Sequence, residues 1–179
     1  MGEKRLLELK ARSLDPARGE AWCAQHAISI EDVHQVDTYF HVGQGRLKLR
    51  VVEGRDEGTL IYYRREDRPD PKRSRVSLLP AADPAALLGL LREALGVLVE
   101  VRKRRRIFRW GEVQIHLDEV AGLGDFVEFE RLLDVSGGVT QAEAEFAELR
   151  TSLGIRDEDL VAGSYSDAVL KLDPNARRA

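Results

Sequence analysis

Apolar and charged residues alternate at every second position over several stretches of this chain. The stretch RLKLR at positions 46–50 is one example. Side chains of a β-strand point to opposite faces in turn, so a period of two is typical of strands. The pattern predicts eight strands, over residues 4–12, 34–42, 45–53, 59–66, 73–79, 98–109, 112–120 and 125–133.

Helices are predicted where capping signals precede apolar residues spaced three and four apart. These signals are Asp15-Pro16, Asp83-Pro84, and Thr140 with Glu143. They predict helices over 16–27, 84–95 and 140–153, and a short fourth helix is expected near 166–172. The pattern shows no domain boundary. We therefore expect a single domain over 1–172 and a frayed tail over 173–179.

The polar faces of the predicted strands are unusual because they carry charges in place of neutral polar residues. Two architectures fit this pattern. In an open antiparallel sheet, the apolar face packs against helices and the charged face meets water. In a closed barrel, the apolar faces point outward beneath the helices and the charged faces line a tunnel. Eight strands would enclose room for one small ligand.

The charges themselves bear on this choice. A buried ion costs several kcal/mol unless it is paired. An interior with more bases than acids therefore requires an anion, and grouped carboxylates require a cation. A triphosphate with a divalent metal ion supplies both, because arginine binds phosphate oxygens bidentately and carboxylates hold hard metal ions.

Composition excludes several other classes of protein. Charged residues make up 33% of the chain, yet the net charge is only −3, which argues against a general polyanion-binding protein. Cys23 is the single cysteine, so an internal disulfide and a cysteine-based zinc site are excluded. The sequence has no signal-peptide pattern and no run of about 18 apolar residues. We expect a cytoplasmic protein with no membrane partner.

Short motifs along the chain resemble, in order, those of the CYTH family of triphosphate tunnel enzymes. The motifs are ELK at 8–10, QVDTYF at 35–40, GRLKLR at 45–50, LIYYRR at 60–65, KRR at 103–105, IHLDEV at 115–120, FVEFE at 126–130 and GSYSD at 163–167. This family includes class IV adenylyl cyclases, thiamine triphosphatases and inorganic triphosphatases, and the motifs are nearest to the class IV cyclase-like branch. The resemblance implies an α+β fold, in which a closed eight-stranded antiparallel barrel has helices packed on its outside.

The resemblance also implies roles for individual side chains. The triphosphate would be bound by Arg12, Arg46, Lys48, Arg50, Arg65, Lys103 and Arg105. Mg²⁺ or Mn²⁺ would be held by Glu8, Asp118, Glu128 and Glu130. Lys10 matches the lysine of the family's N-terminal signature and would act as a general base or as a further phosphate ligand. Leu6 stands where that signature has its first glutamate, so one carboxylate ligand is missing.

A metal-dependent enzyme acting on ATP, thiamine triphosphate or inorganic triphosphate is therefore expected. Two reactions fit such a site: cyclisation of ATP to cyclic AMP and pyrophosphate, and hydrolysis by water. The alternatives are a non-catalytic nucleotide or polyphosphate sensor and a nucleic-acid-binding barrel. The aromatic content of 6% argues against the last. The resemblance further suggests a homodimer.

Three further motifs have structural interpretations. His116 is expected to bond a carboxylate or the ligand inside the tunnel, and not to ligate a metal. Ser164-Tyr165 is expected to plug the tunnel mouth. The segment GLG at 122–124 predicts a hairpin turn and not a phosphate loop, because it lacks the lysine and the following helix of a P-loop.

Overall fold

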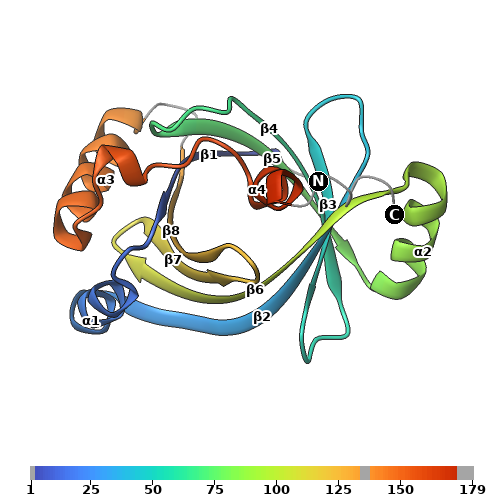
Figure 1. Cartoon of the computed structure of the whole chain (residues 1–179), viewed down its shortest axis with the longest axis horizontal. Helices are drawn as coiled ribbons and strands as arrows, with labels where there is room; N and C mark the ends of the chain where they lie inside the picture. The colour runs from blue at the N-terminus through green and yellow to red at the C-terminus, as the bar shows by residue number, and fades with distance from the viewer. Residues whose placement is uncertain (1–2, 134–137, 173–179) are drawn as a thin grey trace.

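The strands of the protein close into a barrel, as Figure 1 shows. The computed structural model describes residues 3–133 and 138–172. The strands pair antiparallel in the order β1-β5-β4-β3-β2-β6-β7-β8, and β8 pairs again with β1. The strands are β1 (Glu3–Arg12), β2 (Ile28–Phe40), β3 (Arg46–Val52), β4 (Gly58–Arg65), β5 (Lys72–Ala81), β6 (Val97–Trp110), β7 (Val113–Val120) and β8 (Gly124–Leu132). The closed eight-stranded barrel is confirmed, and each predicted strand overlaps an observed one.

Three helices cover the outside of the barrel: α1 (Pro16–His26), α2 (Pro84–Leu95) and α3 (Val139–Leu153). α1 and α3 pack on the outward side chains of β1, β7 and β8, including Leu9, Ile115 and Phe129. α2 packs in the same way on β3, where Leu87 contacts the cluster around Leu49. These outward residues are the apolar positions of the alternating pattern, so the charged positions point inward.

The fourth helix, α4 (Tyr165–Leu172), lies within the ring of strands in Figure 1, after the short 3-10 helix η1 (Asp157–Asp159). Tyr165 and Leu170 pack with Tyr39, Val101 and Phe126, which belong to β2, β6 and β8. The plug expected at Ser164-Tyr165 agrees with this position. α4 departs from the expectation that all helices lie outside, because the inner faces of these strands are apolar here and α4 removes them from water.

Local signals explain where the helices begin. Asp15 and Asp83 each accept a hydrogen bond from the backbone amide three residues later, at 3.1 and 2.9 Å, as predicted for α1 and α2. The capping box predicted at Thr140 is wrong. α3 begins at Val139, and its N-cap is Gly138, which makes no side-chain cap.

β2 begins at Ile28, earlier than the predicted stretch 34–42, and it ends at Phe40. Its first residues are mostly exposed, and its register with β6 shifts between Ser29 and Glu31. Such a bulge breaks the alternation that marks a strand in the sequence. The segment 173–179, predicted to be a frayed tail, lies outside the described residues.

The turn between β7 and β8 is the predicted hairpin. Gly122 and Gly124 have φ values of 74° and 89°, which glycine adopts without strain. No helix among residues 3–133 and 138–172 combines the length and the apolar character needed to cross a membrane.

Candidate triphosphate and metal site

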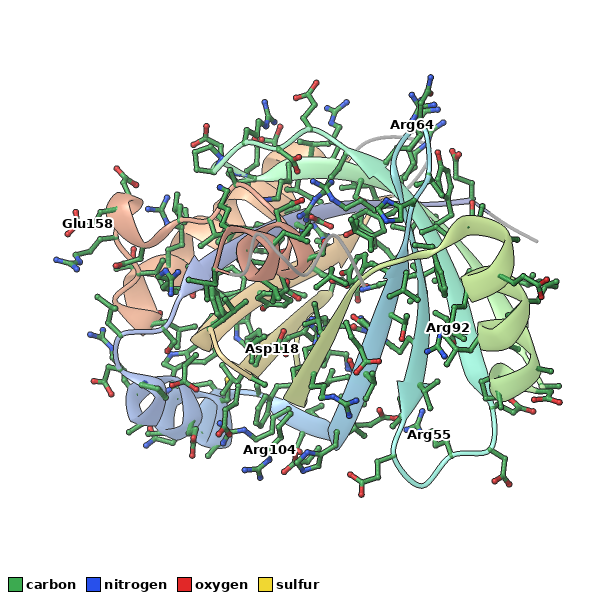
Figure 2. The ribbon with its side chains drawn as sticks, turned by 45° about the vertical axis from the view of Figure 1, so that its right-hand side comes forward. Arg55, Arg64, Arg92, Arg104, Asp118 and Glu158 are labelled. Carbon is green, nitrogen blue, oxygen red and sulfur yellow. The ribbon has the colours of Figure 1, made fainter. Side chains whose placement is uncertain are left out.

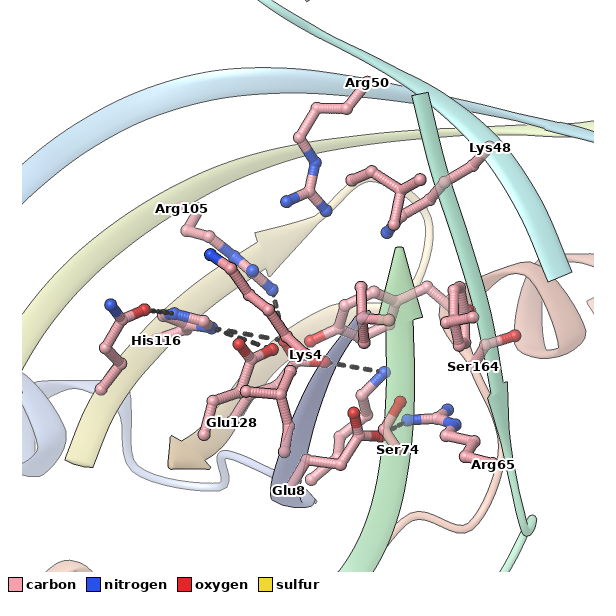
Figure 3. A pocket seen from close by; sticks show the side chains of 18 of the residues that line it. Lys4, Glu8, Lys48, Arg50, Arg65, Ser74, Arg105, His116, Glu128 and Ser164 are labelled. Atoms are coloured by element: carbon pink, nitrogen blue, oxygen red, sulfur yellow. Dashed lines mark hydrogen bonds and ion pairs between the residues drawn. The ribbon is translucent and has the colours of Figure 1, made fainter. Parts of the chain in front are cut away.

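Inward-facing side chains of the barrel enclose a cavity of about 340 Å³ beside α4. Cavities of this order hold small ligands. Its cationic lining residues are Lys4, Lys10, Lys48, Arg50, Arg65, Lys103 and Arg105. Its acidic lining residues are Glu8, Glu112, Glu128 and Glu130. Figure 3 shows many of these side chains projecting into one space from different strands.

Two of the lining cations lie across the barrel from the carboxylates of β8. In the ring of strands, β3 is four strands from β8 in either direction, so the two strands face each other. Lys48 and Arg50 on β3 therefore oppose Glu128 and Glu130 on β8. Figure 3 shows Lys48 and Arg50 on the opposite side of the space from Glu128. A ligand that spans the cavity would meet Lys48 and Arg50 on one side. On the other side it would meet the carboxylates of β8, with Lys10 and Arg105 beside Glu128.

Asp37 of β2 pairs with the cations of β3. Arg50 donates hydrogen bonds of 2.7 and 2.8 Å to its carboxylate, and Lys48 donates another of 2.8 Å. Burial by itself would raise the pKa of Asp37, but Arg50 and Lys48 hold that pKa well below its ordinary value. Burial and the neighbouring Arg50 lower the pKa of Lys48 to about 8.

Asp118 of β7 is the centre of a second buried cluster, and Figure 2 shows it inside the ring of strands. Arg105 donates to its two oxygens at 2.6 and 2.5 Å, and the Tyr165 hydroxyl donates at 2.8 Å. Burial would raise the pKa of Asp118, but Arg105 and Lys103 lower it to about 2. Asp118 is 2% exposed and is not among the residues that line the cavity. Asp118 therefore orients Arg105 and Tyr165, and this geometry does not suit the metal-binding role expected for it.

Lys103 of β6 lies between these two clusters. Its Nζ is 3.5 Å from Asp118 and 3.9 Å from Asp37, and it lies 4.9 Å from the centroid of the Tyr165 ring. Burial, and then the nearby Arg105 guanidinium, lowers the pKa of Lys103 to about 7. Near neutral pH both forms of this amine are populated, and an incoming anion would favour the protonated form.

His116, Glu128 and Glu130 form a group that suits a divalent cation. One ligand atom from each lies within 4.8 Å of the others. His116 Nδ1 is buried and has no hydrogen-bond partner among the described residues. Carboxylate oxygens suit Mg²⁺ and Mn²⁺, and imidazole nitrogens suit transition metals. The residues present thus fit the metal dependence that the sequence predicts.

Comparison with known proteins agrees with this geometry. Residues 7–165 match the model of the CYTH domain. The chain belongs to the CYTH family. No curated protein matches it significantly in sequence.

Solved structures with the CYTH-like fold cover nearly all of the chain. The PH1012 protein from Pyrococcus horikoshii OT3 superimposes with a TM-score of 0.80 at 20% identity, covering 90% of this chain and 98% of its own. A candidate adenylate cyclase from Vibrio parahaemolyticus gives 0.77 at 20% identity, covering 94% and 99%. HpAC1 from Hippeastrum gives 0.67 at 16% identity, covering 94% and 95%. At these identities the likeness shows the fold.

Within the CYTH pattern, Leu6 is the main departure of this chain. Its side chain lines the cavity beside Leu132, its neighbour across the β1–β8 pair. Glu8, the next inward residue of β1, pairs with Arg65. An apolar side chain therefore stands where the CYTH signature has a carboxylate, and Glu8 has an arginine as its neighbour.

Lys10, the signature lysine, lies between a carboxylate and an aromatic ring. Its Nζ is 2.9 Å from Glu128 and 3.5 Å from the centroid of the Tyr165 ring. A carboxylate and the face of an aromatic ring are both contacts that a cationic side chain makes. The geometry suits a phosphate ligand better than a general base, and the role of Lys10 stays a prediction.

Two of the expected triphosphate ligands of this CYTH protein lie outside the cavity. Arg12, the last residue of β1, is exposed, and its guanidinium carbon lies 5.2 Å from the centroid of the Phe126 ring. Arg46, the first residue of β3, donates to Asp67 at 2.6 Å and to Asp167 of α4 at 2.8 Å. Both arginines occupy strand ends, where the alternation continues but the cavity does not. Arg46 anchors α4, and neither contact suits triphosphate binding.

Two residues near the site carried no functional expectation. Gln114 of β7 has its Oε1 3.4 Å from His116 Nε2. Lys72 is fully buried and donates to three backbone carbonyls, those of Arg68, Val161 and Ala162, at 3.0–3.1 Å. Gln114 shares the inward face with His116 by alternation, so the pattern could have pointed to it. Lys72 follows two prolines in an apparent loop, where no pattern singles it out.

Proposed function

We propose that this CYTH protein is a metal-dependent enzyme that hydrolyses a phosphoanhydride bond of a triphosphate-bearing substrate. The supporting observation is that Lys48 and Arg50 oppose Glu128 and Glu130 across the cavity. A chain of phosphates can lie against the cations while a metal ion joins it to the carboxylates. HpAC1 from Hippeastrum, which has a similar fold, is described as having a dominant triphosphatase activity.

The side chains would bind phosphate by exchanging partners. Arg105 pairs with Asp118 and Glu128, and Arg65 pairs with Glu8. Phosphate oxygens would draw these guanidinium groups toward the ligand, which frees Glu128 and Glu8 to face a cation. Bound Mg²⁺ or Mn²⁺ would supply positive charge to the phosphate oxygens and acidify a bound water. The lysines and arginines would stabilise the charge that develops on the equatorial and leaving oxygens.

Cyclisation of ATP is the second candidate, because part of the cavity is apolar. That part is lined by Leu6, Val76, Leu78, Ile107 and Leu132. Covering apolar surface contributes about 25 cal/mol per Å², so an organic group on the α-phosphate would bind more favourably here than a bare phosphate chain. The similar structure from Vibrio parahaemolyticus is described as a candidate adenylate cyclase.

The nucleic-acid-binding alternative has less support. The outward arginines of β6 would form its basic stripe, and each pairs with a carboxylate: Arg102 with Glu100, Arg104 with Asp32, and Arg106 with Glu20. Paired surface arginines offer little free charge to a polyanion.

A panel of metals and substrates tests the proposed function. ATP, thiamine triphosphate and inorganic triphosphate would each be incubated with Mg²⁺ or Mn²⁺, and phosphate, pyrophosphate and cyclic nucleotide would be measured. Phosphate release supports hydrolysis, while cyclic AMP with pyrophosphate supports the second candidate. Tight binding without any product would contradict both and indicate the non-catalytic sensor.

Arg50→Ala tests the placement of the phosphates. We expect it to weaken triphosphate binding at least tenfold, about 1.4 kcal/mol, because a charged hydrogen bond to phosphate is lost. Arg104→Ala is the matched control, since Arg104 also makes a bidentate pair with an aspartate, Asp32, but on the outside of the barrel. Calorimetric titration would measure both, and unchanged affinity in Arg50→Ala would remove Arg50 from the site.

A further inference from the structure

His116 is a buried side chain whose inward-facing nitrogen lacks a partner. The side chain is 3% exposed, and Nδ1 makes no hydrogen bond within the described part of the chain. Nδ1 lies 3.6 Å from a Glu128 oxygen and 3.8 Å from a Glu130 oxygen. Figure 3 shows His116 directed at Glu128. Lys10 and Arg105 already pair with Glu128, but among the described residues no lysine or arginine forms an ion pair with Glu130. A cation at this point would therefore stabilise the Glu130 carboxylate.

Gln114 indicates which tautomer the neutral ring would adopt. Its amide oxygen lies 3.4 Å from His116 Nε2. An amide oxygen can only accept, so Nε2 carries a hydrogen. In the neutral ring this leaves the lone pair on Nδ1, aimed at the two glutamates. Metal-binding histidines are commonly held in this way, with the second ring nitrogen bonded to an oxygen.

Contrary to the expectation from the sequence that His116 does not ligate a metal, we propose that His116 Nδ1, Glu128 and Glu130 bind one first-row transition metal ion, Mn²⁺ in preference to Mg²⁺. Mg²⁺ favours oxygen ligands in a strict octahedron, whereas an imidazole nitrogen raises affinity for the later divalent metals. His116 thereby offsets the carboxylate that Leu6 removes from β1. His116 Nδ1 lies 3.6 Å from a Glu128 oxygen and 3.8 Å from a Glu130 oxygen, close to the roughly 3.1–3.6 Å between adjacent ligands of one ion at about 2.2 Å.

The competing explanation is that a proton supplies the positive charge. An imidazolium ring would then form ion pairs with Glu128 and Glu130 and would have no part in metal binding. The two explanations differ in what His116 contributes when metal is added, so metal binding alone can separate them.

Mn²⁺ titration of the full chain tests the proposal without any substrate. Electron paramagnetic resonance of free Mn²⁺ measures affinity, and electron spin-echo modulation detects a nitrogen bonded to the bound ion. We expect a directly coordinated nitrogen in the wild type and at least tenfold tighter binding of Mn²⁺ than of Mg²⁺. In His116→Gln, which keeps a polar group toward Gln114 but removes the atom at Nδ1, we expect the nitrogen signal to disappear. Its Mn²⁺ affinity should fall at least tenfold and its Mg²⁺ affinity less than threefold.

His34→Gln is the matched control, because it makes the same change at an exposed residue outside the barrel. If Mn²⁺ bound to the wild-type protein shows no coordinated nitrogen, the proposal is overturned, and this result does not depend on whether His116→Gln folds. If His116→Gln folds and binds Mn²⁺ as tightly as the wild type, the proposal is also overturned. The inference rests on the proposed function only where it places the metal ion beside the phosphates of the substrate. Nitrogen-coordinated Mn²⁺ with no product from any triphosphate would therefore refute the function and leave the metal site standing.

Discussion

Replacing Asp118 by asparagine tests whether this carboxylate orients Arg105 or binds metal. Removing one partner of a buried ion pair costs about 3–5 kcal/mol. Arg105 keeps Glu128 as a partner, and asparagine keeps an oxygen that can accept from Tyr165. We therefore expect Asp118→Asn to lower the free energy of unfolding by about 3 kcal/mol, near the lower limit of this range. In a protein of this size, that loss lowers Tm by roughly 6–12 °C.

Urea unfolding and Mn²⁺ titration would measure the two effects of Asp118→Asn separately. Because the pKa of Asp118 is lowered to about 2 in the folded protein, its stabilisation is complete above the unfolded value of about 4 and is lost as pH falls toward 2. The difference from the wild type should therefore be full at neutral pH and shrink in acid. Glu119→Gln, on the exposed face of the same strand, should change stability by less than about 0.5 kcal/mol. Loss of metal affinity with unchanged stability would refute this role and make Asp118 a ligand.

Two further predictions concern buried lysines. The pKa of Lys103 is about 7 and that of Lys48 is about 8, and phosphate would raise both. Triphosphate binding at about pH 8 should therefore take up at least one proton and should weaken as pH rises above 7. Calorimetry in buffers of different ionisation enthalpy measures this uptake, and its absence would count against both lysines as phosphate ligands. Lys72→Met should leave three carbonyls without their donor and lower the free energy of unfolding by roughly 3 kcal/mol. It should also speed amide exchange in α4 relative to the control Arg73→Met, a change at an exposed neighbour. Equal exchange in both variants would mean that Lys72 does not hold the segment before α4.

Most of the barrel could be predicted because a wall with one apolar and one charged face imposes a period of two. β3 and β8 show this clearly, since their alternate residues meet either a helix or the cavity. The start of β2 could not be predicted because it lacks this difference between its two faces. Its residues before Val33 are largely exposed and contain a bulge, so no difference between faces selects their side chains.

The individual roles of the charged residues were harder to predict than their direction. Alternation places Arg46, Arg12 and Asp118 on the same faces as the residues that line the cavity, but it does not say how far along the barrel the cavity extends. That limit is set by α4, which contacts Arg46 through Asp167 and Asp118 through Tyr165. These are contacts between residues more than 40 positions apart, and no local pattern reports them.

The pairing of charges inside the barrel explains how such an interior can exist at all. Unpaired cations along the cavity would each cost several kcal/mol, and Asp37, Asp118, Glu128 and Glu8 remove that cost by pairing with them. Under the proposed function, a triphosphate with a metal ion would bind by exchange, because phosphate would replace carboxylate around the arginines while Glu128 would turn to the metal. Glu128 is the residue common to both arrangements, since it contacts Lys10, Arg105 and His116. The same side chain would therefore link metal binding to phosphate binding in the proposed function, so each should strengthen the other.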